Sequence, residues 1–239
     1  MPGAAGMTRP ATRDDLAALP VEVAPLLLGG HLETVVAGER VVLRITEVEA
    51  YHGLGTGDRP DPGSHARGGA TARNATMWGE PGHLYVYLSH GIHSCVNVVS
   101  GPEGVAGGVL LRGGEVIEGA DVAERRRIER RGVVRAARDL ARGPGRLGDA
   151  VGLRHPVHDG IDAVTGAERA QARARLFLPD APPAHVATGP RVGVAGIAGT
   201  DAFPWRFWIE GDPTVSAFRW GRGAAEAAAR QGDTPRVLD

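Results

Sequence analysis

The chain has 239 residues, of which 42% are hydrophobic, and a formal net charge of −1 at pH 7. This length can bury a full core and favours one domain, while the near-zero charge excludes a uniformly basic nucleic-acid-binding protein. All 27 cationic side chains are arginine, which excludes enzymes that act through a lysine Schiff base, a pyridoxal linkage or a phosphate-loop lysine.

The ends of the chain and its single cysteine bear on location. The N-terminus lacks the basic start and apolar run of a secretory signal, and no segment is apolar for long enough to span a bilayer. Cys95 lies in an apolar run and is expected to be buried. We predict a cytoplasmic protein without membrane contact, with one domain over residues 13–221, a flexible tail over 1–12 and a C-terminal tail over 222–239.

Helix and strand signals follow one another without a repeated β-α-β rhythm. Asp14 or Asp15 is placed to cap a first helix over 16–28, which Pro20 and Pro25 divide in two. Two further helices are expected over 118–142, interrupted at Gly132, with a shorter turn over 146–151. The expected strands cover residues 31–36, 40–50, 84–88, 92–99, 105–111, 174–178, 191–194 and 205–209. This pattern predicts an α+β fold built on an antiparallel or mixed sheet.

Residues 46–97 carry the most informative chemistry. They combine an acidic strand (TEVEAY), a glycine loop with a histidine (GSHARGG) and an aromatic hairpin (LYVYLSHGIHSCVN). The pair His90-Gly91 supplies the glycine that a tight two-residue turn favours. A carboxylate that faces aromatic rings, next to a hairpin tip, suits an enzyme that holds a nucleobase outside its helix.

This stretch, together with later segments, resembles the alkyladenine, or 3-methyladenine, DNA glycosylase family. The likeness is collinear and covers nearly everything between the two tails, so it is more specific than any single motif. It is carried by residues 46–51, 64–69, Arg73-Asn74, 81–87, Gly91, Asn97 and 109–112, and downstream by Gly143-Pro144, Leu147, 190–194, 204–208 and 211–216.

The resemblance implies a monofunctional enzyme of base excision repair. Such an enzyme flips an alkylated purine out of double-stranded DNA and hydrolyses its N-glycosidic bond, here with 3-methyladenine and 7-methylguanine as substrates and hypoxanthine and ethenoadenine as further candidates. It also implies a curved, mainly antiparallel sheet with flanking helices and a protruding DNA-inserting β-hairpin. We expect a monomer that needs no cofactor and no metal, and that associates with the nucleoid while it acts.

The catalytic residues that the resemblance selects are Glu49, Arg112 and Val192. A carboxylate at a strand end can accept a proton from the water that attacks C1′ and can stabilise an oxocarbenium-like sugar. Glu47 shares the strand face of Glu49, and we interpret it as a solvated carboxylate. Arg112 and a backbone carbonyl, that of Val192, would orient the water. As structure alone, Arg112 could simply pair with Glu49, which would keep the carboxylate ionised.

The base-binding residues of the family correspond to Tyr51, His65, Tyr87 and Asn97. Electron-rich rings suit a purine made cationic by alkylation, and Asn97 would crowd the amino group of normal guanine. The alternatives are core aromatics, the better interpretation for Tyr85, and a buried amide at Asn97 that satisfies strand ends. An insertion, GLGTGDRPDP, lengthens the segment between Tyr51 and His65 relative to the family.

The expected DNA-binding residues are His90, Gly91, Arg142 and Arg146. His90 occupies the hairpin tip, where the family commonly places a tyrosine that fills the gap left by the flipped nucleotide. Nine arginines lie between Arg125 and Arg146, and we expect some of them to bind phosphates. The alternatives are a turn histidine without a role and solvated helix faces.

Two other interpretations compete with this one. The residues His83, His90, His93 and Cys95 could suggest a metal site, but alternation along strands does not make them converge. A hydrolase of free nucleosides or other N-glycosides would share the carboxylate and the rings, and a non-catalytic DNA-damage-binding protein would share the basic surface.

Overall fold

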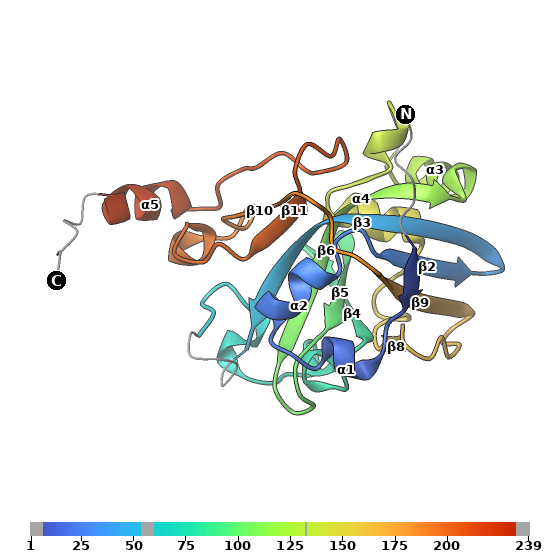
Figure 1. Cartoon of the computed structure of the whole chain (residues 1–239), viewed down its shortest axis with the longest axis horizontal. Helices are drawn as coiled ribbons and strands as arrows, with labels where there is room; N and C mark the ends of the chain where they lie inside the picture. The colour runs from blue at the N-terminus through green and yellow to red at the C-terminus, as the bar shows by residue number, and fades with distance from the viewer. Residues whose placement is uncertain (1–6, 54–59, 132, 233–239) are drawn as a thin grey trace.

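A curled sheet is the framework of the computed structural model, which describes residues 7–53, 60–131 and 133–232 and builds eleven strands from them (Figure 1). All strand pairs are antiparallel, so the predicted α+β fold with an antiparallel sheet is confirmed. The path is β1-β9-β2-β3-β6-β5-β4-β8, with β11 between β3 and β10, and β7 beside β6. The strands are β1 (Thr8–Pro10), β2 (His31–Val36), β3 (Glu39–His52), β4 (His83–Ser89), β5 (His93–Val99), β6 (Gly107–Glu118), β7 (Ala141–Arg142), β8 (Ile161–Asp162), β9 (Ala172–Pro179), β10 (Val186–Gly189) and β11 (Arg206–Ile209).

Strand β3 organises the sheet because three neighbours pair with it. One edge lies against β6 along most of its length, while the other edge pairs first with β2 and then, from Glu47 to Glu49, with β11. In the β3–β6 ladder Glu47 faces Gly113 and Val48 faces Leu111, so Arg112 is the extra residue of a β-bulge. A bulge redirects the side chain of its extra residue, and here that side chain reaches the carboxylates of β3.

The helices are short and lie around the sheet. Thr12 caps the first one, since its hydroxyl accepts the N–H of Asp15 and the Asp15 carboxylate accepts the N–H of Thr12; the prediction that Asp14 or Asp15 is the cap was therefore wrong. The predicted break at Pro20 is confirmed, although Pro25 lies inside the second helix. The helices are α1 (Arg13–Leu16), α2 (Pro20–Leu26), α3 (Ala120–Arg131), α4 (Pro144–Val151) and α5 (Ala224–Gly232), with 3-10 turns η1 (His65–Gly68), η2 (Ala75–Trp78), η3 (Ala137–Asp139) and η4 (Gly196–Gly199).

Two expected elements are absent from the described residues. The segment predicted as a helix up to residue 142 contains only η3 and then β7, because Ala141 and Arg142 pair with Gly114 and Gly113 of β6. The segment 191–194, predicted as a strand, is a loop that bends at Gly193, whose φ is +72°. The neighbouring strand is β10 instead.

Ordered structure extends beyond the predicted domain limits of 13–221 at both ends. Thr8–Pro10 forms β1, which pairs with β9, and Ala224–Gly232 forms α5, which packs on η4 and lies at one side of the molecule (Figure 1). Three residues that end in a proline are too short to show an alternating strand pattern, so the pairing partner decides this element. A helix long and apolar enough to cross a bilayer does not occur among the described residues.

The β4–β5 hairpin turns at His90-Gly91 as the sequence predicts, but its loop has three residues instead of two, because Ser89 pairs with His93 and Ile92 belongs to the turn. The N–H of Ile92 donates to the carbonyl of Ser89 at 3.0 Å, and the two central residues have positive φ, 51° at His90 and 69° at Gly91. Histidine tolerates this left-handed conformation better than most residues do, and glycine adopts it freely. Behind the turn, Cys95 is buried as expected.

Candidate active site

Glu49 lies at the centre of the site and is fully buried, with 0% of its surface exposed. Its Oε1 accepts the backbone N–H of Val192 at 2.6 Å. Its Oε2 accepts the Tyr51 hydroxyl at 2.8 Å and Nη1 of Arg112 at 3.4 Å. The structure thus brings together the three predicted catalytic residues. Val192 contacts Glu49 through its N–H, whereas the sequence predicted a role for its carbonyl, which stays a prediction.

Glu47 corrects the interpretation of the acidic strand. It is not a solvated carboxylate but is 0% exposed. Its Oε1 accepts Nε of Arg206 at 2.7 Å and Nε of Arg112 at 3.1 Å, while Oε2 accepts the N–H of Ser216 at 2.7 Å. The Ser216 hydroxyl donates to Oε1 as well. Glu47 therefore ties β6, β11 and the Ser216 segment to β3, directly beside Glu49.

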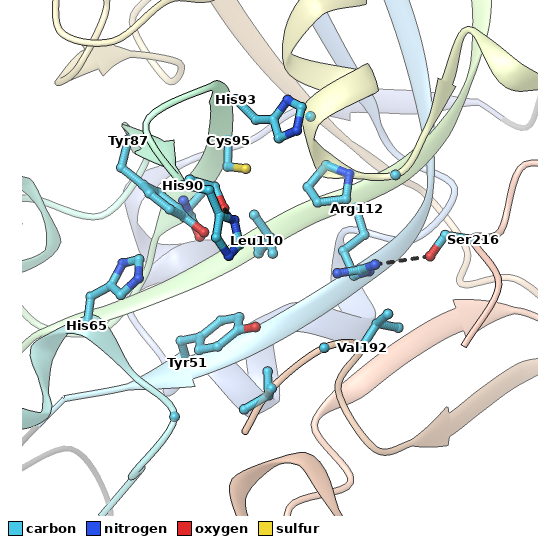
Figure 2. Close-up of a pocket in the computed structure, with 18 of the residues that line it drawn as sticks. Tyr51, His65, Tyr87, His90, His93, Cys95, Leu110, Arg112, Val192 and Ser216 are labelled. Atoms are coloured by element: carbon cyan, nitrogen blue, oxygen red, sulfur yellow. Dashed lines mark hydrogen bonds between the residues drawn. The ribbon is translucent and has the colours of Figure 1, made fainter. Parts of the chain in front are cut away.

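Arg112 connects the two carboxylates. Burial lowers the pKa of Arg112, but Glu49 and Glu47 together raise it more, so its net pKa lies above the ordinary value and the guanidinium stays charged. Its Nη2 also donates to the Ser216 hydroxyl at 3.2 Å (Figure 2). One arginine that bridges two buried carboxylates holds a fixed geometry, because its planar fork offers donors in set directions.

Three rings, those of Tyr51, His65 and Tyr87, line one space. Figure 2 shows Tyr51, His65 and Tyr87 directed toward this space, and the His65 ring meets the Tyr87 ring edge to face at 4.6 Å. Burial and the Glu49 charge raise the pKa of Tyr51 well above 10, so its hydroxyl remains a donor. Burial, with Arg73 and Arg67 nearby, lowers the pKa of His65, which leaves its ring neutral at pH 7.

Asn97 fits both interpretations that the sequence left open. It is buried, and its Nδ2 donates to the carbonyl of Tyr85 at 3.0 Å, as a structural amide would. It also lines the same cleft as the rings. Tyr85, interpreted as a core aromatic, is only 2% exposed and stacks on Tyr87 with ring centroids 5.3 Å apart.

The three rings and Asn97 line an open cleft of about 1130 Å³, together with Arg112 and Val192, which cover Glu49. Of the predicted DNA-binding residues, His90, Arg142 and Arg146 line it, whereas Gly91 sits at the turn outside the lining. Within the described residues the wall contains no Asp or Glu. It contains five arginines, which are Arg67, Arg112, Arg142, Arg146 and Arg219. A protein of net charge −1 thus concentrates positive charge at one concave surface.

The arginines of α3 do not line this cleft. Arg125 and Arg126 pair with Glu39, and Arg127 and Arg130 lie within 4 Å of the Asp149 carboxylate. Arg126 and Arg127 are also buried. Arg126 and Arg127 therefore anchor α3 to α4 and to the β2–β3 hairpin, and phosphate binding by others of the nine arginines stays a prediction.

Arg191 is a site residue that sequence reasoning missed. Its guanidinium is fully buried, lies 4.5 Å from the centre of the Tyr51 ring and forms a two-pronged pair with Asp61, with both N···O distances 2.7 Å. It also donates to the carbonyls of Ala50 and Ala198. The resemblance included 190–194, but Arg191 and Asp61 are 130 residues apart, so no local pattern indicates the pair.

Among the described residues, no group of three His, Cys, Asp or Glu side chains is placed to hold a metal ion.

Most of the inserted segment between Tyr51 and His65, residues 54–59, lies outside the described part of the chain.

Comparison with known proteins decides the family. A family model described as methylpurine-DNA glycosylase matches residues 14–213. The chain belongs to this family. The resemblance predicted from the sequence is thereby confirmed.

Relatives of this methylpurine-DNA glycosylase family member match along most of their length. Three carry the provisional name 3-methyladenine DNA glycosylase. The protein of Leifsonia xyli subsp. xyli is 50% identical, and the match covers 87% of this chain and 92% of the relative. The protein of Streptomyces avermitilis is 46% identical, with 88% of this chain and 92% of the relative covered. The protein of Nocardia farcinica is also 46% identical, with 90% of this chain and 94% of the relative covered. The family match ends at residue 213, so the wall segment from Ser216 to Trp220 lies beyond it.

Proposed function

We propose that this protein is a monofunctional DNA glycosylase of base excision repair that acts as a monomer on double-stranded DNA containing alkylated purines. The observation that carries the proposal is a buried carboxylate, Glu49, held by three residues of an arginine-lined cleft that also presents three rings. Family membership and the names of the relatives support the same activity.

The rings explain how damage would be selected. A purine alkylated at N3 or N7 is cationic, and a cation over an aromatic face gains about 0.5–2 kcal/mol per favourable contact. Tyr51 and Tyr87 would supply these faces, and a neutral His65 adds no opposing charge. An intact purine gains less from the same rings. The purine must leave the duplex to reach them, so the nucleotide flips into the cleft.

Glu49 would then act as the general base. It accepts a proton from a water as the water oxygen bonds to C1′ of the deoxyribose, while the C1′–N bond breaks and its electron pair leaves with the purine. An ionised carboxylate has about four acceptor sites, and the three hydrogen bonds of Glu49 leave one on Oε1, beside Val192. That site is where the water would be held.

The two rival functions, a hydrolase of free nucleosides and a non-catalytic DNA-damage-binding protein, each leave one feature of the site unexplained. A hydrolase of free nucleosides would not need an arginine-lined wall, and a binding protein would not need a buried carboxylate at its centre. Incubation with methylated duplex DNA and, separately, with 7-methylguanosine tests the proposal. Base release from DNA alone is the expected result. Release from the nucleoside, or binding without release, would replace the proposal with the first or the second rival.

We expect the abasic product to remain unnicked. Strand cleavage by β-elimination requires an amine that forms an imine with the abasic sugar, and the chain has no lysine. Reaction products run on a denaturing gel should show cleaved strand only after alkali treatment. Cleavage without alkali that persists after the N-terminal amine is blocked would contradict this expectation.

A further inference from the structure

An exposed aromatic pair stands at the rim of the cleft on the C-terminal side. Phe218 is 37% exposed and Trp220 is 45% exposed, and their rings meet edge to face with centroids 4.9 Å apart. Trp220 and the intervening Arg219 both line the cleft. Two adjacent large apolar rings in contact with water around an exposed arginine are typical of a surface that binds a partner.

The segment that carries this pair is fixed to the catalytic loop. The N–H of Gly193 donates to the carbonyl of Arg219 at 2.9 Å, and the N–H of Gly196 donates to that of Arg222 at 3.0 Å. Gly193 follows Val192, whose N–H binds Glu49. The aromatic rim and the carboxylate are thus held in one connected unit, and a molecule bound to the rim is positioned relative to Glu49.

The charge around the rim identifies the partner. Arg219 and Arg222 are exposed, Arg142 and Arg146 lie in the same cleft wall, and that wall has no carboxylate among the described residues. Arginines beside exposed rings suit a polyanion that also offers flat apolar faces, which is the chemistry of nucleic acid. An acidic peptide would use the arginines but not the ring faces.

We propose that the segment Ala217–Arg222, called the aromatic rim, is a DNA-binding surface of this protein. Arg219 binds a backbone phosphate of the duplex, and the Phe218–Trp220 pair packs against the sugar or base next to the extruded nucleotide. The inference rests on the proposed glycosylase function. It adds a DNA contact outside the three rings and the β4–β5 hairpin. DNA bound to the rim is also connected to the loop that carries Val192, through the hydrogen bonds of Gly193 and Gly196 to the rim.

Binding of a fluorescein-labelled, undamaged duplex and of the same duplex with a tetrahydrofuran abasic analogue tests the rim, with anisotropy measured over a range of salt. Trp220→Ala should raise Kd about tenfold, and Trp220→Phe should recover most of the loss. Arg219→Ala should weaken binding and reduce the slope of log K against log salt by about 0.9. The matched controls Ile128→Ala, at an exposed position of α3, and Arg173→Ala, on β9, should leave Kd unchanged.

The outcomes separate the rim from the glycosylase function. If the wild type excises methylpurines but Trp220→Ala and Arg219→Ala bind DNA as tightly as the controls, the rim proposal is overturned and the proposed function stands. If the wild type neither binds nor excises, the proposed function fails first. Each variant is checked by its thermal midpoint. A concentration-dependent dimer of the wild type that Trp220→Ala abolishes would assign the rim to self-association instead and overturn the proposal.

Discussion

Glu49→Gln should reduce single-turnover excision of 7-methylguanine from duplex DNA by about 100- to 10,000-fold, the usual contribution of a positioned general base. The glutamine carbonyl can still accept a hydrogen bond from the N–H of Val192 or from the hydroxyl of Tyr51. The fold and the arrangement of the three rings are therefore expected to persist. Affinity for duplex DNA with an abasic analogue should therefore stay close to that of the wild type. Rapid-quench assays with enzyme in excess give the rate, and anisotropy gives the affinity.

Two further glutamate variants make this result specific. Glu115→Gln changes an exposed carboxylate of β6 that pairs with Arg44 and should leave the excision rate unchanged. Glu47→Gln removes the charge that binds Arg206, Arg112 and Ser216. It should therefore lower the thermal midpoint more than Glu49→Gln does. Full excision activity in Glu49→Gln would remove this residue from the mechanism.

Asp61→Asn should lower the free energy of unfolding by about 3 kcal/mol, because a buried ion pair that loses one partner leaves an uncompensated charge. The Asp61 carboxylate accepts hydrogen bonds from Nη1 and Nη2 of Arg191 and from the backbone N–H groups of Gly63 and His52. The side chains of Asp61 and Arg191 are both fully buried. Urea denaturation measures the change. Excision should fall as well, since Arg191 lies beneath the Tyr51 ring.

Glu168→Gln is the matched control for this variant. Glu168 pairs with Arg173 at 3.1 Å, and both side chains are more than half exposed. Exposed pairs contribute about 0–1 kcal/mol, so its urea midpoint should hardly move. Equal shifts in Asp61→Asn and Glu168→Gln would show that burial of the Arg191 pair contributes nothing to stability.

The sheet was predictable where β-branched and aromatic residues cluster. The strand that becomes β3 and the hairpin of β4 and β5 follow directly from such runs, and the glycine at the turn marks their junction. The β1 strand was not predictable, because its three residues pair with β9 and have no pattern of their own. The same holds for β7, where pairing with β6 overrides the helical composition of the preceding residues.

The sequence predicted that Glu49, Arg112 and Val192 act together, and the structure places them in contact, but the burial of the two glutamates and the part played by Arg191 were not predicted. Alternation places Glu47 and Glu49 on one strand face, and nothing local distinguishes them. What buries Glu47 comes from Arg206 and Ser216, which are 159 and 169 residues away. The Arg191–Asp61 pair has the same origin. Contacts between segments this far apart depend on the completed fold, so a single sequence leaves them undetermined.

The complete seclusion of Glu49 from solvent has a consequence for turnover. If Glu49 is the general base, as proposed, the attacking water must reach it past Tyr51, Arg112 and Val192, which hold the fully buried carboxylate. The rate of excision would then depend on how readily water passes these three residues as well as on the proton transfer itself. Engineering that aims at a faster or a more discriminating protein would begin with the residues that seal Glu49.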